Sequence, residues 1–94
     1  GLDNALEGAL SLSPNPASEH AVLRFTLREA RDLDWQLLDL QGRVLQSGGS
    51  AFAAGAGQVE LNLDGLAAGT YLVALKAGER VYRERLLLAP AGER

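Results

Sequence analysis

The 94-residue chain is long enough for one domain with one hydrophobic core, and its apolar fraction of 47% is typical of a globular protein. It has no cysteine, one histidine (His20) and a formal net charge of −3, so we expect no disulfide, no histidine- or cysteine-based metal site and no nucleic-acid binding. No apolar run approaches the roughly 20 residues of a membrane span, and we expect none.

The chain opens with nine residues that we interpret as a linker remnant, because so short a stretch of helical composition is not stable alone. A short edge strand is expected over Leu10–Ser13. Beyond it, apolar and polar residues alternate, which indicates strands with one buried face. The predicted strands of this kind are residues 21–28, 33–38, 59–64 and 70–76.

Turn residues separate these strands at about 10-residue intervals, which favours a sandwich over a βαβ unit. Asp39 to Gly42 is predicted to form a type I turn with Gly42 in the left-handed conformation, braced by Asp39 and paired with Arg43. Gly69 is expected to take a positive φ, and Tyr71 to turn its ring inward as in a tyrosine corner. The predicted fold is an all-β, immunoglobulin-like antiparallel β-sandwich of about seven strands.

Two segments do not follow the alternation. Ser47–Gly57 is rich in glycine, alanine and serine, and we predict a long flexible loop there. In residues 80–88 the apolar positions change parity, and a β-bulge near Arg83–Arg85 would return both apolar ends to the core. We therefore expect a bulged last strand.

The candidate catalytic groups are sparse. Asp32 and Asp34 fall on one strand face, where neighbouring carboxylates are usually solvated charge rather than an acid–base pair. His20 has no partner for a nucleophilic relay, and the glycines near residue 55 do not precede a helix as in a phosphate loop. We expect no catalytic site, no metal and no cofactor, and we predict that the chain is not an enzyme.

Four stretches in order carry a resemblance to a known family. They are Ser13-Pro-Asn-Pro-Ala17, Trp35-Gln-Leu-Leu-Asp-Leu-Gln-Gly-Arg-Val44, Leu63-Asp-Gly-Leu-Ala-Ala-Gly-Thr-Tyr-Leu-Val73 and a final leucine-rich strand. Together they resemble the type A C-terminal sorting domain of the type IX (Por) secretion system of Bacteroidetes. The resemblance places the β-sandwich sorting domain at residues 10–89, after a linker remnant at 1–9 and before a tail at 90–94.

The resemblance implies a sorting signal that directs a larger cargo protein, fused at its N-terminal side, across the outer membrane. Its implied partners are the type IX translocon, a shuttle protein and a sortase-like protein, with the cargo passing through the periplasm to the cell surface or the medium. The residues that match the family's motifs, and are expected to serve recognition, are Pro14, Asn15, Pro16, Asp39, Gly42, Arg43, Gly69, Tyr71, Leu86, Leu87 and Leu88.

One departure and two alternatives stand beside this hypothesis. Many family members carry lysine near the end, whereas here Arg83 and Arg85 precede the leucines and a tail follows. A non-catalytic immunoglobulin-like spacer or a carbohydrate-binding accessory module would also suit a sandwich of this size, with Tyr82 and Phe52 as the aromatic residues left for sugar contacts. The immunoglobulin-like segment of flagellar hook-capping proteins shares the Asp-x-x-Gly-Arg turn.

Overall fold

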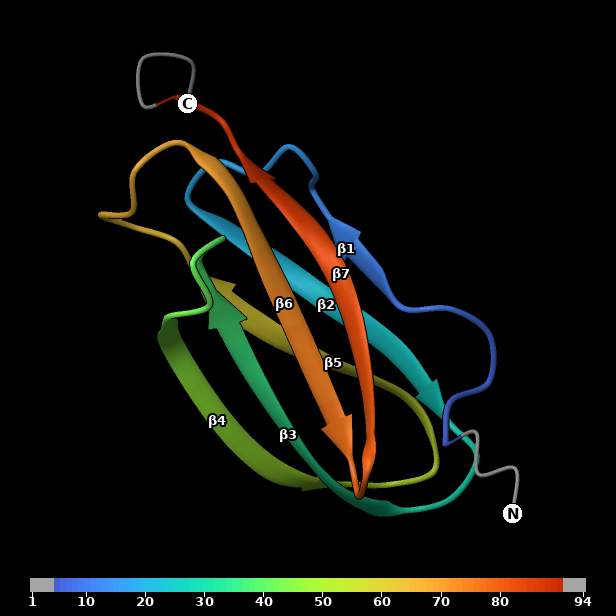
Figure 1. Ribbon diagram of the computed structural model, residues 1–94. Helices are drawn as coiled ribbons and strands as arrows, with labels where there is room; N and C mark the ends of the chain where they lie inside the picture. Colours follow the sequence, from blue (N-terminus) through green and yellow to red (C-terminus); the bar gives the residue numbers. More distant parts are fainter. Residues whose placement is uncertain (1–4, 91–94) are drawn as a thin grey trace.

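The computed structural model describes residues 5–90 and contains seven β-strands in two layers (Figure 1). The strands are β1 (Ser11–Ser13), β2 (His20–Leu27), β3 (Arg31–Leu38), β4 (Val44–Phe52), β5 (Gly55–Asn62), β6 (Gly69–Ala77) and β7 (Arg80–Leu88). One sheet has the order β1-β2-β5 and the other β4-β3-β6-β7, with every neighbouring pair antiparallel. The predicted antiparallel β-sandwich is confirmed.

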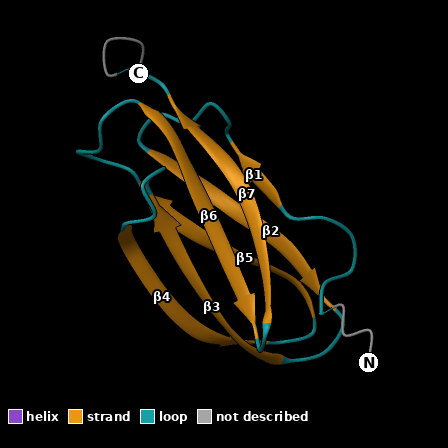
Figure 2. Ribbon diagram, viewed as in Figure 1, coloured by secondary structure: helices purple, strands orange, loops and turns teal. Residues whose placement is uncertain are grey.

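Only strands, turns and loops are present within residues 5–90 (Figure 2). That part of the chain accordingly contains no helix with the length and apolarity to cross a membrane.

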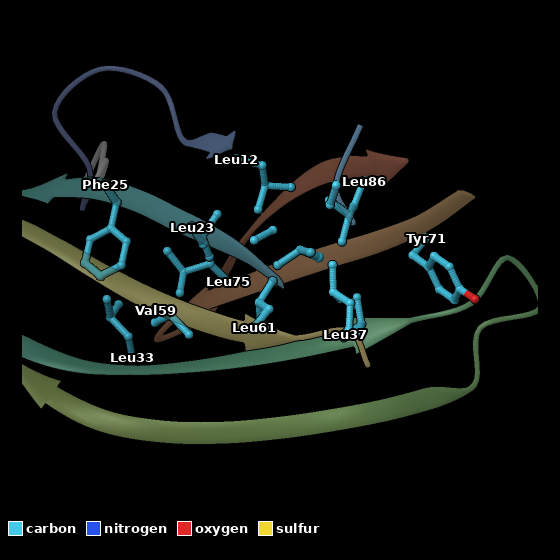
Figure 3. Close-up of a cluster of buried hydrophobic side chains, with 14 of the residues drawn as sticks. Leu12, Leu23, Phe25, Leu33, Leu37, Val59, Leu61, Tyr71, Leu75 and Leu86 are labelled. Carbon is cyan, nitrogen blue, oxygen red and sulfur yellow. The ribbon is translucent and has the colours of Figure 1, made fainter. Parts of the chain in front are cut away.

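Leucine fills most of the core between the sheets (Figure 3). Because successive side chains of a strand point to opposite faces, the alternation in the sequence puts every second side chain of a strand, most often a leucine, into the core. The largest fully buried side chains are Leu6, Leu23, Leu33, Leu37, Leu61, Leu63, Val73, Leu75 and Leu86.

The loop predicted for Ser47–Gly57 is wrong, because most of this segment belongs to β4 and β5, which are joined by two residues. Each strand places a glycine opposite an aromatic residue of its neighbour: Gly48 pairs with Trp35 and Gly57 with Phe25. A Cβ at Gly57 would lie 2.6 Å from the Phe25 ring, and one at Gly48 would overlap the Trp35 indole. The small residues are therefore the surface on which two large rings lie.

The predicted bulge near Arg83–Arg85 is also wrong. Strand β7 pairs with β6 without interruption from Arg80 opposite Ala77 to Leu88 opposite Gly69. The strand needs no bulge because Tyr82, on the same face as Leu86 and Leu88, packs its half-buried ring against the core. Val81 lies on the other face and is half-buried there. The irregularity in this sheet lies instead between Leu37 and Leu38, where β3 pairs with β4.

The N-terminal segment packs on the sandwich from Ala5 onward. Leu6 is fully buried and bridges to Leu27, and the amide of Arg28 donates to the Ala5 carbonyl (3.1 Å). The described part of the predicted linker thus contributes to the core. Residues 1–4 of that linker, and residues 91–94 of the predicted tail, lie outside the described residues.

Candidate functional site

The four motif segments meet at one end of the sandwich. Across the four-stranded sheet, Leu38 lies opposite Leu72, Tyr71 opposite Leu86, and Gly69 opposite Leu88. Ala17, just after the proline motif, forms a parallel bridge to Leu88. We call this region the motif end and define it as residues 14–17, 39–43, 69–71 and 86–88; it is the end from which β7 leads to the C-terminus in Figure 1.

Asp39 organises the turn between β3 and β4. Its Oδ1 atom accepts hydrogen bonds from the amides of Gln41 and Arg43, both at 2.9 Å, and its Oδ2 atom accepts one from Arg43 Nε at 2.7 Å. Gly42, at a φ of 88°, donates its amide to the Asp39 carbonyl (3.1 Å). The predicted turn and the bracing by Asp39 are confirmed. The Asp39 carboxylate shapes a backbone and is already engaged, so it is not free to act as an acid or base.

Acidification should weaken this turn. The Arg43 amide is the largest cause that holds the pKa of Asp39 below its ordinary value of 3.8; partial burial opposes it, and the Arg43 guanidinium and Gln41 amide add to it. A carboxyl whose pKa is lowered by folding stabilises the folded state above its unfolded pKa, and this contribution is lost as the pH falls through the folded pKa. We expect the free energy of unfolding to exceed that of Asp39→Asn at pH 6, and the difference to shrink below about pH 3.8.

Urea unfolding of both proteins between pH 6 and pH 2 measures that difference. Both proteins carry the same other carboxyl groups, so the titration of these groups cancels in the difference. A difference that stayed constant down to pH 2 would contradict a role for the charged form of Asp39.

Tyr71 closes the same end of the core. Its ring is buried and its hydroxyl donates to the Ala67 carbonyl four residues earlier, which is the tyrosine-corner contact (Figure 3). Gly69 precedes it at a φ of 147°, in the region that favours glycine. Both conformations agree with the sequence predictions and give these two residues structural roles.

Asn15 joins the proline motif to the last strand. Its side-chain amide donates to the Arg85 carbonyl (2.9 Å) and its side-chain oxygen accepts from the Leu87 amide (2.9 Å). Pro14 and Pro16 beside it are exposed, and both preceding peptide bonds are cis. Two further bonds continue the contact, from the Ala17 amide to the Leu87 carbonyl and from the Ala89 amide to the Ala17 carbonyl. The Asn15 side chain thus provides hydrogen-bond partners for main-chain groups of β7 at the edge that does not pair with β6.

Removing this side chain should loosen the contact without unfolding the domain. Each hydrogen bond contributes about 1 kcal/mol, and these two are exposed, so we expect Asn15→Ala to cost about 1 kcal/mol and to lower Tm by about 4–8 °C. Asn15→Asp keeps the acceptor for Leu87 but turns a carboxylate oxygen toward the Arg85 carbonyl, so its Tm should also lie below that of the unsubstituted chain. Thermal unfolding followed by circular dichroism tests this, and an unchanged Tm for Asn15→Ala would show that the two bonds do not stabilise the fold.

The three terminal leucines divide between two faces. Leu86 and Leu88 are buried among the core residues, whereas Leu87 points outward and is 41% exposed. Of these three, only Leu87 offers an apolar side chain to another protein.

A hollow of about 360 Å³ lies between the β3–β4 turn and the β5–β6 loop, at the motif end. Four of the predicted residues line it, namely Asp39, Arg43, Gly69 and Tyr71. Its apolar lining comes from Leu40, Leu45, Leu66 and Ala68, which the sequence did not single out. Leu40 is 62% exposed although it lies in a tight turn where polar residues are usual, and that mismatch was the available signal.

The remaining candidate residues do not form a second site. His20, Asp32 and Asp34 are exposed, and residues 5–90 hold no group of three or more metal-binding side chains. Tyr82 and Phe52 are half-buried against the core, and Phe52 meets Phe25 edge-on at 5.2 Å, so neither is a flat exposed platform for a sugar. Two larger hollows lie on the sheets and contain none of the predicted motif residues.

Comparison with known proteins finds one family that covers most of the chain. The family model described as "Secretion system C-terminal sorting domain" matches residues 11–89. That range runs from β1 to the residue after β7 and includes all four segments of the motif end. None of the curated proteins matches the chain.

Proposed function

The chain belongs to the family of secretion system C-terminal sorting domains, and from this premise we propose that its motif end is the surface recognised during export. The domain is a sorting signal of type IX secretion: it is attached to a cargo, interacts with the type IX machinery, and directs export toward the cell surface or the extracellular space. Its family is non-catalytic, and the accessory-module alternative is not favoured.

The observation that supports the proposal is the convergence of the motifs. Segments up to about 70 residues apart in the chain, such as Asn15 and β7, meet at one end. Ala5 and Leu6 lie at the opposite end, where Leu27 pairs with Gly55 (Figure 1). Because the described chain enters the sandwich at this far end, we expect a cargo fused on the N-terminal side to lie away from the motif end.

We assign the finer roles as follows. The translocon and its shuttle protein bind the motif end in the periplasm, by contact with exposed side chains and without chemistry in this chain. A sortase-like protein then separates cargo from domain, at the linker side. Residues that are buried or engaged, such as Tyr71 and Asp39, shape this surface, while Pro14, Pro16, Arg43 and Leu87 are exposed on it.

Fusion to a reporter tests the proposal. The chain is joined to the C-terminus of a periplasmic reporter enzyme in a bacterium with a type IX system, and surface and periplasmic activity are measured. We expect surface delivery that is lost in a strain without the translocon and absent from the reporter alone. Retention of the fusion in the periplasm of the intact strain would overturn the proposal.

A further inference from the structure

We propose that the hollow at the motif end binds an extended peptide that carries an aliphatic side chain and a carboxylate two residues apart, on a surface of the export partner. This inference rests on the proposed function and names the chemistry that the partner must supply. The three parts of the site are an apolar lining, an unengaged cation and a free strand edge.

The apolar part is formed by Leu40, Leu45, Leu66 and Ala68. A volume of about 360 Å³ lies at the lower end of the ~300–1,000 Å³ range of ligand pockets, enough for an aliphatic side chain but not for a large cofactor. Most of the Leu40 side chain remains exposed, and burial by a partner would remove this apolar surface from water.

The cation is Arg43, which is one of the residues that line the same hollow. Asp39 engages only the Nε atom, and the two terminal amino groups have no partner within residues 5–90. The side chain is 77% exposed, so its own ion pair contributes little to stability, whereas its free donors can form a bidentate pair with an incoming carboxylate. Asp39 therefore aims a guanidinium that remains available.

The third part is the strand edge that begins beside the hollow. Leu45 belongs to β4, the outermost strand of its sheet, and β4 carries no charged residue from Val44 to Phe52. An exposed edge without charge or proline can pair with an added strand. A peptide would pair with such an edge through its main chain, and its residues i and i+2 would face the same side, so both side chains can reach one hollow. A fatty acid also carries a carboxylate and an apolar chain but cannot pair with the edge, so a peptide is favoured.

Binding of a defined probe tests the chemistry. We use the acetylated and amidated octapeptide Thr-Ser-Leu-Thr-Asp-Ser-Thr-Ser and follow the backbone amides of the whole 94-residue chain by NMR. We expect saturable shifts at Leu40, Arg43 and Leu45, with affinity about tenfold weaker when the peptide Asp is replaced by Asn or its Leu by Ala. A peptide at about 10 mM would nearly saturate a site with a Kd of about 1 mM. Absence of shifts at this concentration, equal binding of the Asn or Ala peptide, or equal binding of octanoate would each overturn the proposal.

A matched pair of variants carries the test into export. Leu40→Ser removes an exposed wall of the hollow. Val44→Ser removes a similarly exposed side chain (49%) that does not line the hollow, and it leaves the main chain with which the β4 edge would pair. Both should keep the Tm of the unsubstituted chain, and only Leu40→Ser should reduce surface delivery of the reporter, by about tenfold on the scale of a lost apolar contact. If the unsubstituted fusion is exported and Leu40→Ser is exported equally, the site is wrong and the sorting function stands; if the unsubstituted fusion stays in the periplasm, the sorting function itself fails.

Discussion

Replacing Leu86 with alanine is expected to lower the free energy of unfolding by about 2–5 kcal/mol, because the cost includes both lost burial and the cavity left behind. Leu86 is fully buried, lies opposite Tyr71 in the sheet and belongs to the core cluster. A domain of this size has a total stability of about 5–15 kcal/mol, so the variant loses a large share of it. Urea unfolding of the 94-residue chain measures the change.

Leu87→Ala is the matched control one residue away. Its side chain points outward, and surface substitutions of this kind usually stay within about 0.5 kcal/mol of the unsubstituted protein. Equal destabilisation by the two variants would contradict the alternation of faces in β7. In the reporter assay, Leu86→Ala should reduce surface delivery because a larger fraction of the domain is unfolded, whereas a failure of Leu87→Ala with unchanged stability would identify Leu87 as a contact residue.

Deletion of residues 80–94 is expected to abolish surface delivery and to leave the cargo in the periplasm. The deletion removes β7 and with it the inward side chains of Tyr82, Leu86 and Leu88. It also leaves the whole of β6 as an unpaired edge next to an opened core, which favours aggregation over a folded signal. Cell fractionation of the reporter fusion, with circular dichroism of the truncated domain, measures both consequences.

Deletion of residues 91–94 alone is the control, because every hydrogen bond of the motif end described above is retained. We expect this shorter deletion to keep the Tm of the intact chain. Normal surface delivery after removal of residues 80–94 would show that the last strand is dispensable and would refute the sorting role assigned to this end.

Much of the fold could be predicted from the sequence because most strands carry a local signal. The alternation in β2 and β6 places Leu23, Phe25 and Val73 in the core, and the Asp39 turn follows from one acid and one glycine. Strands β4 and β5 carry no such signal over residues 47–57. Their strand conformation depends on pairing with β3 and β2, because strand propensity is set by the surrounding sheet. The small residues fit there because Trp35 and Phe25 leave no room for a side chain opposite them.

The residues of the candidate site could be proposed from the sequence, but the shape of the surface that they form could not. A turn aspartate, a glycine before a tyrosine and a proline motif can be recognised one at a time in a sequence. The bonds from Asn15 to β7 could not be, because they join residues at separations of 70 and 72. The hollow was missed for the same reason: Leu40 and Leu66 come from different loops and share a surface only after the sandwich has formed.

The long-range contact of Asn15 also makes the assembly of the motif end depend on synthesis of the last strand. Bringing residues some 70 positions apart together is an entropically costly step that local structure does not assist. A ribosome that stops before Arg85 leaves Asn15 without its acceptor and its donor, and leaves Tyr71 without Leu86, the residue opposite it in β7. The motif end is thus assembled only in a chain translated through its last strand, so a prematurely terminated product carries the proline motif but not the finished surface.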